Sequence, residues 1–320
     1  MADKNLDVVV VGELNIDLVL WGVSMPEYEK EFLAEDMRFS MGASSAITAH
    51  NLSAVGGRVG YIGKVGADTF GDFMIQQLDA GGVETSHILR DKNLKTGATI
   101  VLANRPKKAL LTYMGAMEHL AIEDMDWDYI RRAKHLHLGC YYLQPGIRQD
   151  APELFAKAKE MGLTTSLDTN WDPKDEWGEN LMELLEYTDI FFPNEDEALR
   201  IAHAHDFDEA LETLRQKVKV LVVKRGEKGA TFCVDDTTYT APGFEVEPVE
   251  TTGAGDSFNA GFLFKYLQKA EWHDCLRFGN ACGAIAVTEL GGTEAFRNKH
   301  LLHSKLESFL HNEQSPFANS

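Results

Sequence analysis

Residues 250–263, ETTGAGDSFNAGFL, join a small, flexible first half to an apolar second half. Past the glycines, apolar side chains recur at Phe258, Phe262, Leu263, Tyr266 and Leu267. This spacing is typical of one face of an amphipathic helix. The stretch therefore predicts a glycine-rich turn that opens directly into a helix.

The start of this predicted helix has the features of an anion site. The first backbone N–H groups of a helix have no partner within it and lie at the positive end of its dipole. Gly253 and Gly255, which flank Ala254, have no Cβ, so a ligand such as phosphate could approach the backbone closely. Asp256 opposes an anion unless it has a task of its own, such as accepting a proton from an attacking hydroxyl. The alternative is a structural aspartate that caps the helix.

The composition limits the classes of partner. A chain of 320 residues with 44% hydrophobic content indicates one large globular domain, or a domain with a smaller appendage. Thirty-one basic and 50 acidic residues give a net charge of −19, so we expect neither nucleic acid nor a membrane as a partner. ATP would need local neutralisation by Mg²⁺, a lysine and backbone amides.

The cysteines and the N-terminus favour a cytoplasmic protein. The four cysteines form no CxxC pair and no metal-like spacing with histidine, which is typical of free thiols in a reducing compartment. Residues 1–7 are polar and acidic, unlike a signal peptide, and no apolar run is long enough to cross a bilayer.

The order of apolar runs predicts an α/β protein. A β-branched run at 7–12 predicts a buried strand, and we expect that strand to continue through Asn15 and Asp17 on one face. At the carboxyl end of a strand these two side chains suit a polyhydroxy ligand, although a solvated strand end is the alternative. Further elements are predicted as a helix from 41–46 to about 55, a strand at 61–66, a helix capped by Asp68, a hairpin of 98–103 and 109–113 around the basic turn 105–108, and strands near 135–139, 163–168, 189–192 and 219–224.

Two strand ends carry candidates for phosphate and metal. Asn194 and Glu197 have the spacing of a capping box, and Glu197 could also hold Mg²⁺ through water. Lys224 begins a turn with Gly226 and Gly229, a positive cluster that suits a triphosphate. The sequence has no GxxxxGK[ST] motif. Residues 168–172 form a further polar cluster after a strand, whereas His135 and His137 are expected to be sheet residues.

Together these motifs resemble the ribokinase-like (PfkB) family of carbohydrate kinases over about residues 7–310. Residues 251–258, TTGAGDSF, look like the C-terminal signature of that family. Four other segments support the likeness in the same chain order, namely 12–17, 63–71, 194–197 and 224–229.

The resemblance implies a three-layer α/β/α sandwich with a mostly parallel central sheet and a small β-sheet lid. We expect the main domain at 1–16, 41–95 and 116–311, the lid at 17–40 and 96–115, and a flexible tail at 312–320. The implied activity is transfer of the γ-phosphate of ATP to a hydroxyl, expected to be primary, of a small neutral sugar such as ribose or fructose. A nucleoside kinase and a catalytically silent binder remain alternatives.

The resemblance also assigns residues to roles. Asp256 corresponds to the catalytic base, and Gly253, Ala254 and Gly255 correspond to the anion hole. The sugar would contact Asn15, Asp17, Gly42 and Ala43. The nucleotide would contact Asn194, Lys224, Gly226, Gly229, Thr251 and Asn280, with Glu197 serving Mg²⁺ through water. Many members also bind a monovalent cation such as K⁺ and form homodimers through the lid.

Three positions depart from the family pattern. Glu250 stands where a shorter residue, usually Asp, is expected in the monovalent-cation loop. The segment 41–46 lacks one glycine of a di-glycine and carries Ala46 at the position of a sugar-binding Asn. Asp172 and Pro173 replace an arginine of some keto-sugar-acid kinases, which argues against an acidic sugar.

Overall fold

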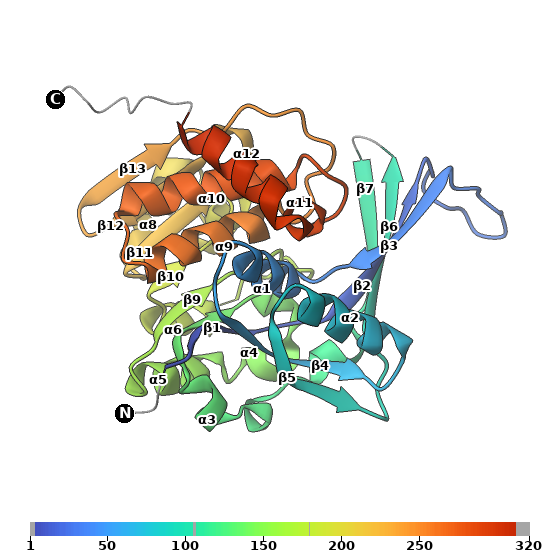
Figure 1. Cartoon of the computed structure of the whole chain (residues 1–320), viewed down its shortest axis with the longest axis horizontal. Helices are drawn as coiled ribbons and strands as arrows, with labels where there is room; N and C mark the ends of the chain where they lie inside the picture. The colour runs from blue at the N-terminus through green and yellow to red at the C-terminus, as the bar shows by residue number, and fades with distance from the viewer. Residues whose placement is uncertain (1–3, 105–106, 179, 312–320) are drawn as a thin grey trace.

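A nine-stranded sheet runs through the centre of the molecule (Figure 1). The computed structural model describes residues 4–104, 107–178 and 180–311. The strand order is β13 (Thr237–Ala241), β12 (Ala230–Val234), β11 (Val220–Lys224), β10 (Ile190–Phe191), β9 (Thr164–Leu167), β8 (Ala133–Leu138), β1 (Leu6–Val11), β4 (Val59–Gly66) and β5 (Glu84–Asp91). All neighbours from β11 to β5 are parallel, and β12 and β13 are added antiparallel.

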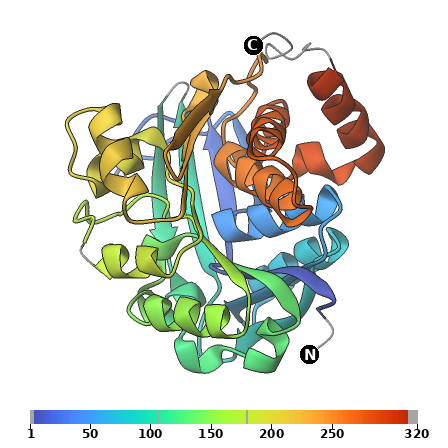
Figure 2. The ribbon, with the colours of Figure 1, turned by 90° about the vertical axis from the view of Figure 1, so that its left-hand side faces the viewer.

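Helices cover both faces of this sheet and make three layers (Figure 2). One face carries α1 (Ser44–Ala54), α2 (Thr69–Ala80), α9 (Ala254–Leu267), α10 (Trp272–Ala286), α11 (Glu294–Arg297) and α12 (Lys299–His311). The other carries α3 (Trp127–Ile130), α4 (Pro145–Arg148), α5 (Ala151–Glu160), α6 (Asn180–Glu186), α7 (Glu195–Ile201) and α8 (Phe207–Arg215). Because side chains of a strand alternate between faces, Val8 and Val10 of β1 enter one apolar core and Val9 and Val11 enter the other.

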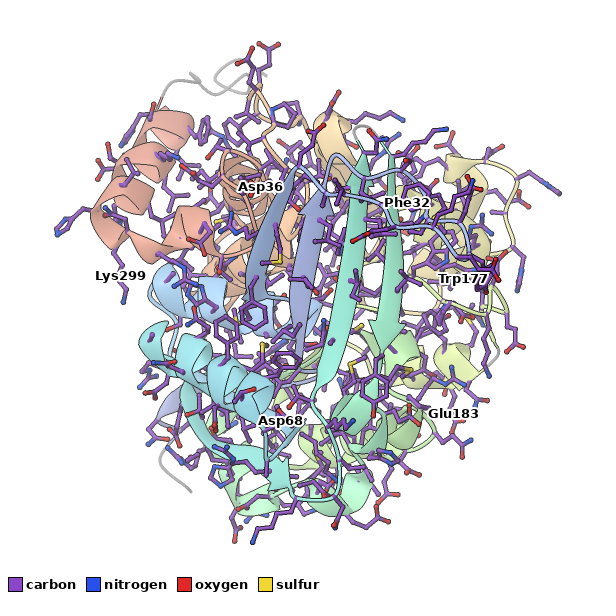
Figure 3. The ribbon with its side chains drawn as sticks, turned by 90° about the vertical axis from the view of Figure 1, so that its right-hand side faces the viewer. Phe32, Asp36, Asp68, Trp177, Glu183 and Lys299 are labelled. Atoms are coloured by element: carbon purple, nitrogen blue, oxygen red, sulfur yellow. The ribbon has the colours of Figure 1, made fainter. Side chains whose placement is uncertain are left out.

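A second, four-stranded sheet projects from the rim of this body, and Figure 3 shows it facing the viewer. Its order is β3 (Asp36–Met41), β2 (Asn15–Trp21), β6 (Gly97–Asn104) and β7 (Lys107–Tyr113), with β2 and β6 parallel and the other pairs antiparallel. The expected α/β/α sandwich with a mostly parallel central sheet and a separate small sheet is therefore confirmed.

Most predicted elements are also confirmed, including the hairpin β6–β7 and the four strands β8 to β11. Asp68 caps α2 as expected, because its carboxylate accepts a hydrogen bond from the Gly71 amide at 2.9 Å (Asp68 is labelled in Figure 3). His135 and His137 are sheet residues that bond Ser166 on the neighbouring strand. All four cysteines are buried free thiols.

The continuous strand expected from residue 7 to Asp17 is wrong. β1 ends at Val11, and the chain leaves the large sheet before β2 begins at Asn15 in the small one. At this crossing Gly12 lies so close to α1 that a Cβ would come within 2.1 Å of Ser45 Oγ, and Tyr61 donates to the Glu13 carbonyl at 2.6 Å. Strands β3, β5, β12 and β13 were not predicted.

Two expectations, the flexible tail at 312–320 and the first half of the basic turn, Arg105 and Pro106, lie outside the described residues. Within those residues, no helix combines the length and the apolar character needed to cross a membrane.

Candidate active site

The predicted turn and helix around Gly253 are present and tightly constrained. Gly253 is the N-cap of α9 and has φ 78°, in the left-handed region. A Cβ at this position would lie 2.5 Å from Gly292 Cα, so only glycine fits without a backbone shift. The helix begins at Ala254, and its first amides, those of Ala254, Gly255 and Asp256, lie at the positive end of the helix dipole.

Asp256, the third residue of α9, is buried among other carboxylates. Burial, followed by the charges of Asp168 and Glu13, raises its pKa well above the usual range of an aspartate. Lys224 and the hydroxyl of Ser44 act in the opposite direction. Such an environment makes the ionised carboxylate a strong proton acceptor.

Ser44, the first residue of α1, lies beside this carboxylate. Its hydroxyl group lowers the pKa of Asp256 and accepts a hydrogen bond from Asn170 Nδ2. Because Asn170 Nδ2 is the donor in that bond, the Ser44 proton remains available for Asp256. Asn170 itself has φ 53°, and its backbone N–H donates to Asp168 Oδ1 at 3.1 Å.

A buried ion pair lies beneath the turn. Lys224 Nζ, at the end of β11, is 2.6 Å from Asp168 Oδ2, just past the end of β9. Asn259 of α9 donates to the same oxygen. Burial opposes the charge on Lys224, but Asp168 and Glu197 outweigh it and raise the pKa of the lysine. Burial likewise opposes the charge on Asp168, and Lys224 outweighs it and lowers the pKa of that carboxyl.

Asn194 and Glu197 form the predicted capping box. Asn194 Oδ1 accepts from the Glu197 amide at 2.8 Å, and Glu197 Oε2 accepts from the Asn194 amide at 2.9 Å. Burial and the charge of Asp168 raise the pKa of Glu197 to about 7. The capping role of both side chains is thus confirmed. Both residues lie beside Lys224, and the metal role of Glu197 stays a prediction.

A pocket of about 450 Å³ opens next to the turn. It is lined by Asn280 and by six other residues predicted for the nucleotide or the anion hole, namely Lys224, Gly226, Gly229, Thr251, Ala254 and Gly255. Phe244, Val246 and Val287 give it an apolar wall. The Asn280 amide donates to the carbonyls of Ala241 and Pro242, so this side chain fixes the wall of the pocket.

The predicted sugar residues gather where the two sheets meet. Asn15 Nδ2 donates to Asp17 Oδ1 at 3.1 Å and to Thr99 Oγ1 at 3.2 Å. Gly42 packs so closely that a Cβ would lie 2.2 Å from Asp17 Oδ1. Burial, followed by the charge of Glu250, raises the pKa of Asp17 to about 7.

The departures from the family pattern have visible consequences. Glu250 joins two loops, since its carboxylate accepts from Thr252 Oγ1 at 2.6 Å and from the Gly291 amide at 2.8 Å. Ala43, at the position of the missing glycine, has φ 67°, where a residue with a Cβ is strained. Ala46 is fully buried in α1.

Sequence reasoning missed Glu13, Ser44 and Asn259, and it gave Asp168 and Asn170 too little weight. Glu13 is buried and accepts hydrogen bonds from both the amide and the hydroxyl of Ser45. The available signal was position, because Glu13 and Asp168 each follow a parallel strand at the same edge of the sheet.

Comparison with known proteins places the chain in a family. The model of the pfkB family carbohydrate kinases matches residues 5–299. The chain is 30% identical to the probable fructokinase-6, chloroplastic, of Arabidopsis thaliana, over 93% of this chain and 82% of that protein. It is also 30% identical to the ATP-dependent ribose-1-phosphate kinase of Halopiger xanaduensis, over 90% and 94% of the two chains.

A solved structure gives the same answer for the fold. A putative ribokinase II from E. coli, in complex with ATP and Mg²⁺, matches with a TM-score of 0.85 at 24% identity, over 96% of this chain and 100% of that one.

Because the family model matches residues 5–299, the chain belongs to the pfkB family of carbohydrate kinases, which are phosphotransferases with an alcohol group as acceptor.

We expect Gly253→Ala to be more destabilising than Gly162→Ala, its matched control. Both glycines have left-handed φ values, 78° and 75°, but a Cβ at Gly162 meets nothing within 4 Å. Each variant should lose about 1–2 kcal/mol for backbone strain. Gly253→Ala should lose at least about 1 kcal/mol more, because its methyl group displaces the 292 backbone.

Urea denaturation of both variants measures this difference. Equal losses of unfolding free energy would show that the contact between Gly253 and Gly292 does not constrain the turn.

Proposed function

We propose that this pfkB-family chain transfers the γ-phosphate of ATP to a primary hydroxyl of a small neutral sugar, such as fructose or ribose. One observation carries the proposal. Asp256, with its raised pKa, stands at the first turn of α9, with the nucleotide-sized pocket on one side. Asn15, Asp17 and Gly42 form the hydrogen-bonding cluster on the sugar side.

The proposed mechanism follows from this arrangement. ATP would bind with its base against the apolar wall of the pocket and its γ-phosphate near the amides of residues 254–256. Asp256, directed by Ser44, would take the proton of the sugar hydroxyl as that oxygen attacks the phosphorus in line. The amides would stabilise the charge on the transferring group, and Lys224 would contact the phosphates.

Two ions belong to the proposal. Mg²⁺, which neutralises phosphate charge, would be held on the Glu197 side through water, and the carboxylates around Lys224 supply the hard oxygen environment that this ion prefers. The E. coli neighbour carries ATP and Mg²⁺. K⁺ would bind near the loop of Glu250, and leaving out each ion in turn from the assay tests both assignments.

The charges of the site favour a neutral acceptor. Glu250 and Glu13 both raise the pKa of Asp17, and Lys108 is the cation that opposes them there. A phosphorylated acceptor, such as that of the Halopiger relative, would add negative charge to this cluster. We therefore place neutral sugars ahead of sugar phosphates, and nucleosides remain the alternative.

Coupled ADP detection with a panel of ribose, fructose, 2-keto-3-deoxygluconate, adenosine and inosine tests the proposal. We expect a neutral sugar to give the highest kcat/KM. Asp256→Asn should keep the fold and lower kcat by about 10²-fold or more, because an amide cannot accept the proton.

Near-normal kcat in Asp256→Asn would rule out the base assignment. Preference for adenosine or inosine would indicate the nucleoside kinase. Thermal stabilisation by several ligands without ADP formation would indicate a silent binder.

The raised pKa of Asp17 predicts a pH effect on sugar binding. A carboxyl group with a pKa of about 7 is neutral below that pH, and an ionised carboxylate accepts stronger hydrogen bonds from hydroxyl groups. The KM for the sugar should therefore rise as pH falls below about 7. Asp17→Asn should have a high KM that no longer changes over this range. The KM for ATP, measured in parallel, is the control, and a sugar KM in Asp17→Asn that still follows pH would contradict the assignment.

We also propose that residues 17–40 and 96–115 form a lid and a homodimer interface. The edge strand β7 exposes Leu111 and Tyr113 on one face of the small sheet and Leu110 on the other, each more than half accessible to solvent. Burying such apolar side chains favours association. Sedimentation should give a dimer at micromolar concentration, and monomer alone would exclude this interface.

A further inference from the structure

A second pocket, of about 180 Å³, lies on the outer side of α1, away from the nucleotide pocket. It is bounded by His50 of α1, Gln77 and Gly81 at the end of α2, and Arg297 and Lys299 at the junction of α11 and α12. Figure 3 shows Lys299 at the outer edge of this helical layer. None of these residues takes part in the proposed reaction.

The pocket is basic, although the chain as a whole carries a net charge of −19. Arg38 and Arg297 share one carboxylate, that of Glu294, at 3.3 and 2.8 Å. Lys299 forms no ion pair with any other described residue. Two cations, Arg297 and Lys299, therefore line the pocket, and the nearby carboxylate of Glu294 is shared with Arg38, which leaves excess positive charge in a concave, polar site.

Gln77 and Arg297 are already oriented toward each other. Arg297 Nη2 donates to Gln77 Oε1, which leaves the amide group of Gln77 as a hydrogen-bond donor. Together with the ammonium group of Lys299, the pocket therefore offers donors from three side chains.

His50 supplies a donor whose presence depends on protonation. Asn51 Nδ2 donates to Ser257 Oγ and to the Gly292 carbonyl, both at 2.9 Å. Asn51 Oδ1 must therefore accept, and the proton in its 2.9 Å bond to His50 lies on Nδ1. Nε2, on the Gly81 side of the ring, is an acceptor in the neutral imidazole and becomes a donor in the imidazolium.

The groups facing His50 account for its titration. Burial, followed by the charges of Arg297 and Lys299, lowers its pKa, whereas Asn51 and Glu294 act in the opposite direction. A bound anion would offset the two cations and favour the imidazolium form.

The same histidine is linked to the catalytic turn. Asn51 bonds Ser257 directly, and Ser257 Oγ donates to the Gly253 carbonyl at 2.7 Å. Gly292, the other acceptor of Asn51, is the residue against which Gly253 packs. A change at His50 thus reaches the first turn of α9 through two neighbouring hydrogen bonds.

We propose that the pocket of His50, Gln77, Arg297 and Lys299 binds a small tetrahedral oxyanion. We propose further that its occupancy is transmitted to the Gly253 turn through Asn51 and Ser257. The ligand class is a dianion, either a free oxyanion or the phosphate group of a monoester. The site would regulate the turn and is separate from the anion hole.

Inorganic sulfate is the first probe, because its charge is constant from pH 5 to 8 and any pH dependence then belongs to the protein. Binding is measured by calorimetry on the full chain, with sodium chloride balancing ionic strength. Lys299→Ala is the test variant, and Lys219→Ala, an exposed lysine outside the pocket, is the matched control. Methyl phosphate, run in parallel, distinguishes a monoester from a free oxyanion.

We expect saturable sulfate binding that weakens as pH rises, that is weakened about tenfold in Lys299→Ala, and that is unchanged in Lys219→Ala. Absence of saturable binding, or equal affinity in Lys299→Ala, would overturn the site.

Hydrogen exchange tests the link to the turn. Sulfate should slow exchange of the amides of residues 253–257 in the wild type and in Lys219→Ala. Protection that persists in Lys299→Ala arises from anions bound directly at the turn and would overturn the coupling, as would binding without protection.

Discussion

The ion pair between Asp168 and Lys224 is the contact on which the arrangement of the site depends. Its two members come from the ends of strands β9 and β11, on either side of β10, and Asn259 of α9 bonds the same carboxylate. The pair therefore joins the edge of the sheet to the helix that carries Gly253 and Asp256. Removing one partner of such a buried pair would leave an uncompensated charge, so separating the sheet edge from α9 is costly. Lys224 also lies against the turn itself, since a Cβ at Gly255 would be 3.4 Å from its Nζ.

One lysine among several carboxylates sets the charge around Asp256 at the turn that we propose to bind an anion. Burial, Asp168 and Glu13 together raise the pKa of Asp256, while Lys224 compensates only in part. In the apo state this excess of negative charge makes Asp256 a strong base and repels ATP. A metal ion that arrives with the nucleotide would offset this repulsion, and its charge would also favour the ionised carboxylate of Asp256, the form that can accept a proton. The net charge of −19 also opposes the approach of ATP, so its binding must depend on groups within the site that offset the phosphate charge.

The sequence was sufficient for the strands β1, β4 and β6 to β11, the turn of Gly253 and the capping box of Asn194, because each of these is a local pattern. The sequence was not sufficient where contacts between distant residues determine the structure. The strand expected through Asp17 ends at Val11, and the next residue, Gly12, packs closely against Ser45, a contact that no local pattern records. Strand β5, ETSHILRD, lacks the apolar alternation that signals a strand. Strand β3, DMRFSM, does alternate, with Met37, Phe39 and Met41 as its apolar residues, so there the signal was present and was overlooked. Ser44 and Asn170 are separated by more than a hundred residues. Their roles could not be predicted from the sequence, because only the folded chain brings Asn170 to Ser44 and Ser44 to Asp256.

Helix α1 connects all parts of this site. Its first residue, Ser44, lies beside Asp256 and lowers the pKa of that carboxyl, and Ser45 is held by the carboxylate of Glu13 at the sheet edge. Two turns later, Asn51 bonds Ser257 in the first turn of α9 and the carbonyl of Gly292, against which Gly253 packs. The helix has no side-chain cap of its own, so its start is positioned by Glu13 rather than by a local motif. A shift of α1 along its axis would therefore move the residue beside the proposed base and the residue that supports the proposed anion hole together. This shared support is the physical reason why we propose that the Gly253 turn can be controlled from the outer face of α1.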